Sequence, residues 1–426
     1  MIKKAVIGDD ITGAMDAGVQ LLKKGLAVSV VFDAQDVSLG NMRGELIIID
    51  TESRNIPPDN AFHKISGILE NIRSSGMPLC YKKVDSTLRG NIGSEFEAVL
   101  ENDDESMIAM VPALPFNGRT TLHGHQLLDG RPITENDLSK DPFSSVLSSY
   151  IPDIIQKQSA AKTGVVDIET VRKGAGAVSK ALAGMKAEGT RIAVIDAESE
   201  EDLKAIREGI RQSGFKILPC GSAGFFPFVF DDSARAKADA KSEKTASPAL
   251  VISGSPAQAS KGQIAVAREK GATVINLNID DITSGGRAVE KEYLRVTEAI
   301  RQSFRQGLDV VVDGAGESKE KIRNSKANIW QGSARLQDFL SRTVNAVISE
   351  FKIAGMMIIG GDTGVNIFKN MGAYSIYITG EPEPYIAAGR LEGGRYADTQ
   401  VITKAGGFGS PDAVVNCIRY FKGFDR

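Results

Sequence analysis

Short apolar runs alternate with amphipathic stretches along almost the whole chain. In the first half the runs predict strands over residues 5–8, 28–32, 46–50, 107–111, 192–196 and 215–218. A second series predicts strands over residues 249–253, 273–277, 309–313, 356–359, 375–378 and 400–403. Strands that alternate with helices are typical of βαβ units, so we expect an α/β fold with mainly parallel sheets flanked by helices.

The two series are separated by a polar segment, residues 231–248, that has almost no large apolar side chain. Such a segment cannot bury a face, which predicts a linker or a solvated helix. A chain of 426 residues is also long for one hydrophobic core. We therefore expect two domains, residues 1–232 and 247–426, each with its own sheet.

The predicted N-terminal domain carries dense charge where its strands end. Residues 82–91 hold three cations, one carboxylate, two hydroxyls and one amide, directly after an apolar run that ends at Tyr81. Asp9 and Asp10 follow the first strand, and Arg54 follows the third. Ligands of open α/β sheets bind at this carboxyl edge. Solvated loops, or Asp10 as a helix cap, would explain any one segment, but together they predict a site for a small polyhydroxy anion.

The strand ends of the predicted C-terminal domain carry glycine and hydroxyl groups instead of charge. They are the turns over residues 253–255, 360–364 and 404–410. Small residues allow backbone amides to approach a phosphate, and the helix that follows adds positive potential. No Walker motif, protein-kinase triplet or G-x-G-x-x-G fingerprint occurs, which weighs against a P-loop protein, a protein kinase and a sugar-acid dehydrogenase. The turns therefore predict a nucleotide site of another kind.

One domain for a polyhydroxy acid and one for phosphates predict phosphoryl transfer from ATP to a substrate hydroxyl, with Mg²⁺ bridging the phosphate oxygens. The active site would then lie in the cleft between the domains. Because Mg²⁺ needs few protein ligands, no metal-binding motif is required. The alternative is a non-catalytic sugar-acid sensor, which would bind the acid but no nucleotide.

Composition excludes some partners. A net charge of −3 gives no reason to expect nucleic acid or an anionic membrane, and no apolar run approaches the roughly 20 residues needed to span a bilayer. Three distant cysteines without an export signal indicate reduced thiols in a cytoplasmic protein. His123 and His125 could hold zinc, but no further Cys or His lies nearby in the sequence, so we expect no protein metal site. A homodimer is one candidate oligomeric state.

The chain resembles the four-carbon acid sugar kinase family in motifs that run in order over nearly its whole length. The matching segments are residues 9–14 with Asp16, 83–90, 112–119, 221–224, 253–255, 360–363 and 403–409. The resemblance implies an N-terminal sugar-acid domain, a C-terminal nucleotide domain, and phosphorylation by ATP of the 4-hydroxyl of D-threonate, D-erythronate or a 3-oxo-tetronate in carbohydrate catabolism. Residues 16–20 favour the threonate and erythronate branches.

The strand ends and the resemblance together give candidate site residues. Those for the acid sugar are Asp9, Asp10, Arg54, Lys83, Asp85, Ser86, Thr87 and Arg89. Asp9 or Asp85 is the expected catalytic base, and Lys82 is assigned a structural role. Those for the nucleotide are Ser253, Gly254, Ser255, Gly360, Gly361, Asp362, Thr363, Gly406 and Gly407.

One segment departs from the family pattern. Where a Gly-Glu-Ile-x-Pro-Gly-x-Pro sequence is expected, the chain runs from Gly380 to Arg390 with Tyr385 in place of a turn glycine. If this loop covers the nucleotide, the substitution would change the nucleotide's fit or the reaction rate.

Overall fold

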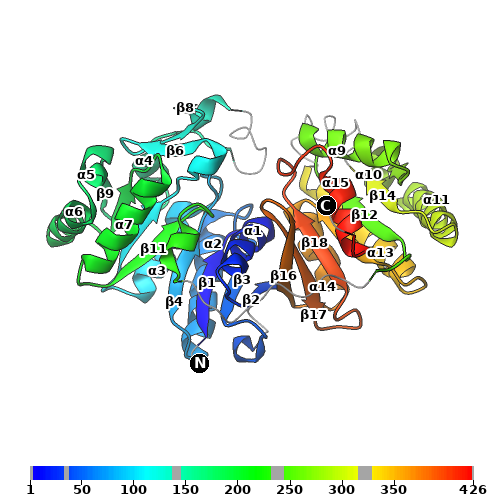
Figure 1. The fold of residues 1–426 in the computed structure, drawn as a ribbon, viewed down its shortest axis with the longest axis horizontal. Coiled ribbons are helices and arrows are strands. Elements are labelled where there is room, and N and C mark those ends of the chain that lie inside the picture. Colours follow the sequence, from blue (N-terminus) through cyan, green and yellow to red (C-terminus); the bar gives the residue numbers. More distant parts are fainter. Residues whose placement is uncertain (1–2, 33–37, 137–144, 232–243, 315–328, 425–426) are drawn as a thin grey trace. The chain divides into compact units, whose positions relative to one another are not determined.

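The structure, a computed structural model, describes residues 3–32, 38–136, 145–231, 244–314 and 329–424. The chain divides into two compact units, Met1–Ala236 and Lys237–Arg426, which we call the N-terminal and C-terminal units. Within each unit, helices pack against a sheet (Figure 1). Residues 232–243 of the predicted linker lie outside the described residues.

The N-terminal unit is built on a parallel sheet with the strand order β2-β3-β1-β4-β11-β5-β10-β9. The strands β2, β3, β5 and β10 are buried along their whole length, as expected of parallel strands covered on both faces by helices. The strands are β1 Lys4–Gly8, β2 Val28–Phe32, β3 Leu46–Asp50, β4 Leu79–Lys83, β5 Met107–Val111, β9 Thr163–Val166, β10 Ile192–Ile195 and β11 Ile217–Gly221. A small antiparallel sheet follows β5 and contains β6 Arg119–Leu122, β7 His125–Leu128 and β8 Arg131–Pro132.

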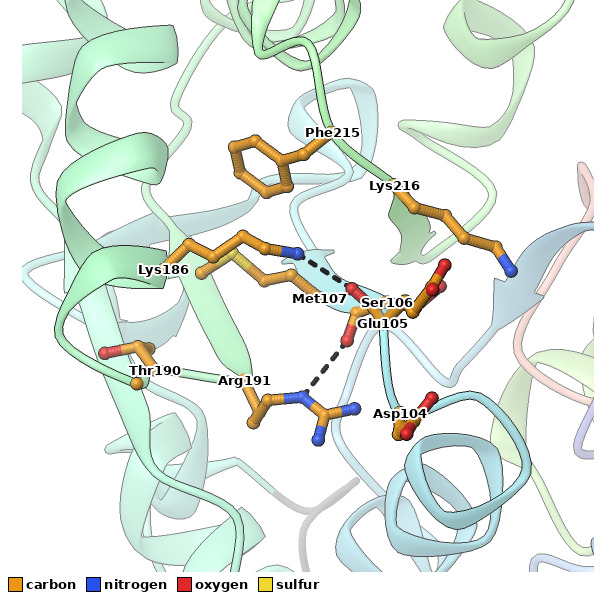
Figure 2. A pocket seen from close by; sticks show the side chains of 10 residues that line it. Asp104, Glu105, Ser106, Met107, Lys186, Thr190, Arg191, Phe215 and Lys216 are labelled. Carbon is orange, nitrogen blue, oxygen red and sulfur yellow. Dashed lines mark hydrogen bonds between the residues drawn. The ribbon is translucent and has the colours of Figure 1, made fainter.

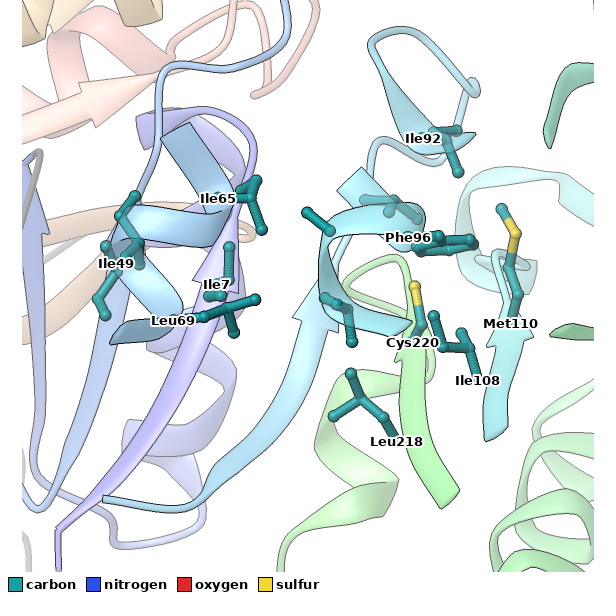
Figure 3. Packing of buried hydrophobic residues seen from close by; sticks show 14 of the residues in the cluster. Ile7, Ile49, Ile65, Leu69, Ile92, Phe96, Ile108, Met110, Leu218 and Cys220 are labelled. Carbon is teal, nitrogen blue, oxygen red and sulfur yellow. The ribbon is translucent and has the colours of Figure 1, made fainter. Parts of the chain in front are cut away.

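Two groups of helices bury this sheet. In one group, Ile65 of α2 and Phe96 of α3 share a core with Ile7 and Cys220 of the sheet (Figure 3). In the other, Phe226 of α8 contacts the Tyr81 ring of β4, with ring centroids 4.7 Å apart. The helices are α1 Ile11–Lys23, α2 Pro58–Ser74, α3 Ile92–Asn102, α4 Ile151–Gln156, α5 Ile168–Arg172, α6 Ala175–Ala187, α7 Glu200–Gln212 and α8 Phe226–Val229, with short 3₁₀ turns η2 Leu39–Asn41, η3 Pro115–Asn117 and η4 Ile133–Glu135.

The C-terminal unit has the strand order β13-β14-β12-β15-β18-β17-β16, in which β17 runs antiparallel to both of its neighbours. Its strands are β12 Ala249–Ser253, β13 Thr273–Asn276, β14 Val310–Asp313, β15 Gly355–Ile359, β16 Ser375–Glu383, β17 Ile386–Glu392 and β18 Gln400–Lys404. Ile264 of α9 and Phe421 of α15 join the core on one face, while α10, α11, α13 and α14 contact one another in series. The helices are α9 Gln258–Glu269, α10 Ile279–Ser284, α11 Gly286–Arg305, α13 Ile329–Ile348, α14 Gly361–Asn370 and α15 Ala413–Phe421.

The two units have the same order of strands around their first strand, and this order determines where a ligand site can lie. In the N-terminal unit β3 and then β2 lie on one side of β1, and β4 pairs with the other side. The C-terminal unit repeats this order with β14 and β13 on one side of β12 and β15 on the other. The carboxyl ends of β1 and β4, and those of β12 and β15, therefore flank topological switch points, where open α/β sheets bind their ligands.

The predicted α/β fold with mainly parallel sheets is confirmed, although some elements differ. The observed β11 begins two residues later than the predicted strand and ends at Gly221. The strands β9 and β17 and the antiparallel sheet β6-β7-β8 were not predicted. The segment from Gly380 to Arg390, expected to be a loop, instead forms most of a β16–β17 hairpin with register shifts after Ile378 and Gly380, so that expectation is wrong. Within the described ranges, no helix combines the length and apolar character needed to cross a bilayer.

Candidate active site

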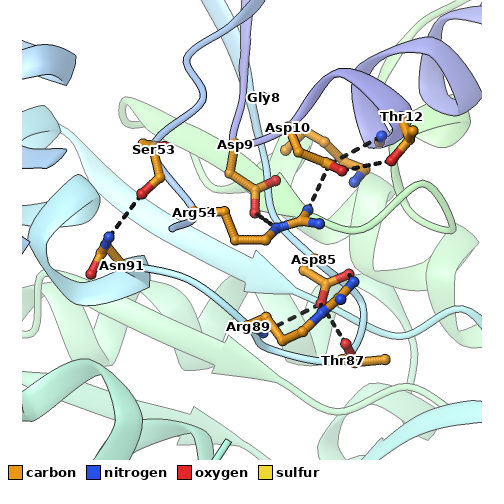
Figure 4. Close-up of polar contacts among 12 residues, drawn as sticks. Gly8, Asp9, Asp10, Thr12, Ser53, Arg54, Asp85, Thr87, Arg89 and Asn91 are labelled. Atoms are coloured by element: carbon orange, nitrogen blue, oxygen red, sulfur yellow. Dashed lines mark hydrogen bonds and ion pairs between the residues drawn. The ribbon is translucent and has the colours of Figure 1, made fainter. Parts of the chain in front are cut away.

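A charged network lies where β1 ends, at the switch point of the N-terminal unit. Arg54, from the loop after β3, donates from Nε to Asp9 Oδ2 at 2.8 Å and from Nη2 to Asp10 Oδ1 at 2.6 Å (Figure 4). Asp10 also caps α1 by accepting from the Gly13 amide at 3.1 Å. Asp9 is buried, and among the described residues its Oδ1 has no hydrogen-bond partner. A buried acceptor without a partner is costly, which makes this oxygen a candidate for binding a ligand hydroxyl.

The loop after β4 carries a second network. Asp85 Oδ2 accepts from Arg89 Nε at 2.7 Å and from the Thr87 hydroxyl (Figure 4). Burial alone would raise the pKa of Asp85, but the guanidinium groups of Arg89 and Arg54 outweigh it and hold that pKa well below its usual range. Asp85 is therefore ionised and already bound to donors, which makes it a weak proton acceptor.

The backbone of this loop is held in an unusual conformation. Leu88 has a φ of 62° and Gly90 a φ of 105°, a region that residues other than glycine rarely adopt. The half-buried Ser86 is fixed through its backbone carbonyl, which accepts from Gln126 Nε2 at 2.8 Å. Such strain is commonly found where a loop presents groups to a ligand.

Lys82 has the structural role that was expected. Its Nζ lies 2.5 Å from Glu95 Oε2, and both side chains are buried. Glu95 Oε1 accepts from Ser53 Oγ at 2.5 Å, and Asn91 Nδ2 donates to the Ser53 carbonyl at 2.8 Å. These bonds join β4, α3 and the loop that carries Arg54, so they fix the two charged networks relative to each other.

Lys83 and Asp16 lie beside these two networks. We call the two networks together with these two side chains the charged cluster. Lys83 ends β4, is 4% exposed, and lies against α1: a methyl group on Gly13 would be 2.6 Å from its Nζ. Asp16 follows Gly13 by three residues and Thr12 by four, so it lies on the same face of the helix. Its Oδ1 is buried and has no partner among the described residues. From the sequence, Asp16 enters only as part of the family motif, although its helical spacing from Thr12 and Gly13 is a signal that could have placed it in the site.

Burial raises the pKa of Asp16 to about 7, although Lys83 opposes the shift. The folded state thus binds the Asp16 proton more tightly than the unfolded state, and this contribution to stability is lost as the pH rises toward 7. Between pH 5 and pH 8 we expect the wild-type protein to lose about 3 kcal/mol more unfolding free energy than Asp16→Asn, at roughly 1.4 kcal/mol per pKa unit over the two units up to pH 7. Urea unfolding at both pH values measures this, with the exposed Asp153→Asn as control. Equal pH dependence in wild type and Asp16→Asn would contradict it.

Arg119 is a cation that sequence reasoning left without a role, although its loop was part of the family motif. Its Nε and Nη1 atoms are buried and have no hydrogen-bond partner among the described residues. Burial lowers the pKa of Arg119, and Asp85 and Asp16 offset this only in part. The guanidinium nevertheless stays charged, because its ordinary pKa is so high.

The predicted nucleotide residues come together at the switch point of the C-terminal unit. The Gly254 amide donates to the Ile359 carbonyl at 2.9 Å, and the Gly360 amide donates to the Lys404 carbonyl at 3.0 Å. These bonds align the turns that follow β12, β15 and β18. The turns hold Ser253, Gly254 and Ser255, then Gly360, Gly361, Asp362 and Thr363, then Gly406 and Gly407.

Glycine is required at positions in these turns because neighbouring side chains approach the backbone closely. A methyl group on Gly254 would lie 2.2 Å from Thr363 Oγ1, and one on Gly406 would lie 2.0 Å from Ser255 Oγ. Gly360 precedes α14 with a φ of 117°, a conformation almost restricted to glycine. The N-terminus of α14 therefore lies at the same edge, as anion sites at helix starts do.

The buried side chain of Lys404 stabilises the turn that follows β18. Its side chain is 1% exposed, and Nζ donates to the carbonyls of Ala405 and Gly406 at 3.0 and 3.2 Å. Ser260 of α9 also donates to the Gly406 carbonyl, at 2.8 Å. Burial lowers the pKa of Lys404 to about 8. With these carbonyls bound from one side, the turn is held in a single conformation.

The atypical Tyr385 forms the tip of the β16–β17 hairpin. It has a φ of 60°, and its ring stacks on that of Phe408 with centroids 6.4 Å apart. Glu383, at the end of β16, accepts from the Ser410 hydroxyl at 3.1 Å and from Asn416 Nδ2 at 2.5 Å. The hairpin tip is thus fastened to the segment that follows β18.

Comparisons with known proteins identify the family of this chain. One family model, a sugar-binding N-terminal domain, matches residues 4–227, and a second, a nucleotide-binding C-terminal domain, matches residues 250–414. The chain is 31% identical to a D-threonate kinase from Salmonella typhimurium, over 99% of both chains. This chain belongs to the four-carbon acid sugar kinase family. It is therefore a phosphotransferase with an alcohol group as acceptor, as the resemblance implied.

One further relative supports this assignment, and one solved structure supports the fold. The kinase is 29% identical to a D-erythronate kinase from Heliobacterium modesticaldum, over 99% of this chain and 97% of that relative. A crystal structure of a Haemophilus influenzae protein aligns with a TM-score of 0.73 and 24% identity, over 98% of this chain and 99% of that one. At that identity the structural match supports the fold alone.

The two histidines of the predicted zinc alternative, His123 and His125, have hydrogen-bond partners in the kinase. His125 Nδ1 lies 2.9 Å from Ser149 Oγ, and the backbone amide of His123 donates to Asp196 at 2.6 Å. Within the described residues, no group of three or more His, Cys, Asp or Glu side chains is placed to hold a metal ion. The expectation from the sequence, that the protein has no metal site built from its own side chains, therefore stays a prediction.

A cavity of about 470 Å³ lies at the amino ends of β5, β10 and β11, the opposite edge of the sheet from the charged cluster (Figure 2). Its cations already have partners. Lys186 donates to the Glu105 carbonyl at 2.8 Å, Arg191 donates to the Ser106 carbonyl at 3.1 Å, and Lys216 pairs with Asp103 at 2.6 Å. These three cations are therefore already paired, and none of them offers a ligand in this cavity an unpaired positive charge.

Proposed function

We propose that this protein uses ATP and Mg²⁺ to phosphorylate the 4-hydroxyl of a four-carbon sugar acid, D-threonate or D-erythronate. The main support is the chemistry of the two switch points: one gathers carboxylates and cations suited to a polyhydroxy acid, and the other gathers glycine turns suited to phosphates. The relatives named D-threonate kinase and D-erythronate kinase favour these acids, with 3-oxo-tetronates as the second candidates.

In this proposal Asp9 binds the reacting hydroxyl. Its buried Oδ1 has no hydrogen-bond partner within the described ranges, while Oδ2 is fixed by Arg54. Asp85, the other candidate base, is engaged by Arg89 and Thr87 and is better suited to orienting them. Phosphoryl transfer is mostly positioning and charge stabilisation, so a carboxylate that fixes the hydroxyl and accepts its proton fits this site.

The C-terminal turns would bind ATP. We propose that the amides of the turns after β12 and β15 bind the β- and γ-phosphates, which the N-terminus of α14 also attracts. Asp362, at the start of α14, and Asp313, at the end of β14, supply oxygen ligands of the kind that Mg²⁺ prefers. When bound, the ion would neutralise charge on the phosphates.

A substrate screen tests this function. ADP release would be measured with Mg²⁺ and ATP against D-threonate, D-erythronate, their L-isomers and 3-oxo-tetronates. We expect kcat/KM for D-threonate or D-erythronate to exceed that for 3-oxo-tetronates at least tenfold. Absence of turnover on every four-carbon acid would refute the proposal. Calorimetric binding of an acid without binding of ATP or ADP would instead support the sensor.

A further inference from the structure

Arg119 is placed beside the charged cluster by a small hairpin. It begins β6, and its amide donates to the Leu114 carbonyl at 3.2 Å, which closes the loop after β5. Two residues on, Thr121 donates to Gln126 Oε1 at 2.8 Å, and Gln126 Nε2 donates in turn to the Ser86 carbonyl at 2.8 Å. The hairpin that carries Arg119 is thus fastened to the loop of Asp85 and Arg89.

The arginines of the cluster differ in what they face. Arg54 is paired with two aspartates, Asp9 and Asp10, and Arg89 is paired with Asp85. Arg119 forms no comparable ion pair within the described residues, and its Nε and Nη1 are buried without partners. Burying charged donors without an acceptor is unfavourable, so this arrangement suits a ligand that brings its own negative charge.

We infer that Arg119 binds the carboxylate of the sugar acid. Nη1 and Nη2 of the planar guanidinium are parallel donors that match the two oxygens of a carboxylate. Arg119 as a whole is half-buried, and Nη2 is not among its buried donors, so an acid would reach the guanidinium from the Nη2 side and meet the buried Nη1 next to it. Arg54 and Arg89, whose charges are balanced by aspartates, then orient Asp9 and Asp85 rather than supply the main positive charge for the acid. This inference rests on the proposed function and names the anchor of its substrate.

The test compares Arg119→Met, Arg119→Lys and wild type with the acid that the wild-type enzyme turns over. Loss of a charge-assisted hydrogen-bonding pair should raise KM about 10- to 100-fold in Arg119→Met, with kcat changed less than fivefold, because ground state and transition state lose the same contact. Arg119→Lys should recover part of the affinity. Arg172→Met is the control, because Arg172 is an exposed arginine paired with Glu198.

Thermal unfolding separates binding from a structural role. Because Nε and Nη1 have no hydrogen-bond partner in the described part of the chain, Arg119→Met should melt at or above the wild-type temperature. An unchanged KM in Arg119→Met, or a lower melting temperature with kcat and KM equally impaired in both variants, would overturn the inference. If wild type itself turns over no four-carbon acid, the proposed function fails instead, and the inference with it.

Discussion

Asp9→Asn should lower kcat about 10²- to 10⁴-fold, the usual contribution of a general base. Asparagine can still accept from Arg54, which now donates to Asp9 Oδ2 at 2.8 Å. The amide nitrogen would then replace Oδ1, the buried oxygen without a partner. A nitrogen that carries two hydrogens cannot accept the proton of the attacking hydroxyl.

Steady-state kinetics with saturating ATP measures this effect. The KM for the acid should change less than tenfold, because the shape of the side chain and its link to Arg54 are kept. Asp59→Asn, an exposed carboxylate in the first turn of α2, is the matched control and should behave as wild type. If Asp9→Asn retained a third or more of the wild-type kcat, Asp9 would not be the base.

Gly360→Ala should weaken ATP binding about 100-fold while the affinity for the sugar acid stays the same. Alanine at a φ of 117° is strained, by roughly 1–3 kcal/mol. Its methyl group would also lie 3.7 Å from Thr363 Oγ1 and 3.9 Å from the Ser255 amide nitrogen, in the space between the two turns proposed to bind phosphate. Both effects act on the nucleotide site alone.

Calorimetric titrations with ADP and with the acid would measure both affinities. Gly262→Ala in α9 is the control, because its methyl group would meet no atom within 4 Å. If the Gly360→Ala variant lost affinity for the acid and the nucleotide equally, the separation of the two sites between the units would be contradicted.

Much of the fold could be predicted because parallel strands covered on both faces are continuous apolar runs. The prediction of β11 was displaced because Pro219, Cys220 and Gly221 have the composition of a turn, whereas in the structure they pair with β5. The hairpin strand β17 was missed because Pro382 and Pro384 next to Gly380 indicate a loop, and only pairing with β16 and β18 stabilises a strand there.

The candidate site could be predicted at the level of its segments but not of its contacts. The strand order brings the ends of β1, β3 and β4 together, so Asp9, Arg54 and Asp85 were found from their places after apolar runs. Which cation pairs with which carboxylate depends on distances of a few ångströms, which no sequence pattern contains. Asp16 and Arg119 emerged only when burial and missing hydrogen-bond partners could be seen.

The raised pKa of Asp16 and the buried Nε and Nη1 of Arg119, which have no hydrogen-bond partner among the described residues, both lower the stability of the free protein. Both place polar groups where the free protein gains little from them, and binding sites often carry such a cost. The acid should therefore stabilise the N-terminal unit more than its size alone suggests, because it would supply the missing partners.

The central claim is that this kinase transfers phosphate from ATP to the 4-hydroxyl of a four-carbon sugar acid. The most direct measurement is the ¹H–³¹P NMR spectrum of the product formed from D-threonate or D-erythronate with Mg²⁺ and ATP. If the 4-hydroxyl is the acceptor, we expect a phosphomonoester whose phosphorus couples to the two protons on C4. A phosphate on C2 or C3, or no phosphorylated acid at all, would contradict it.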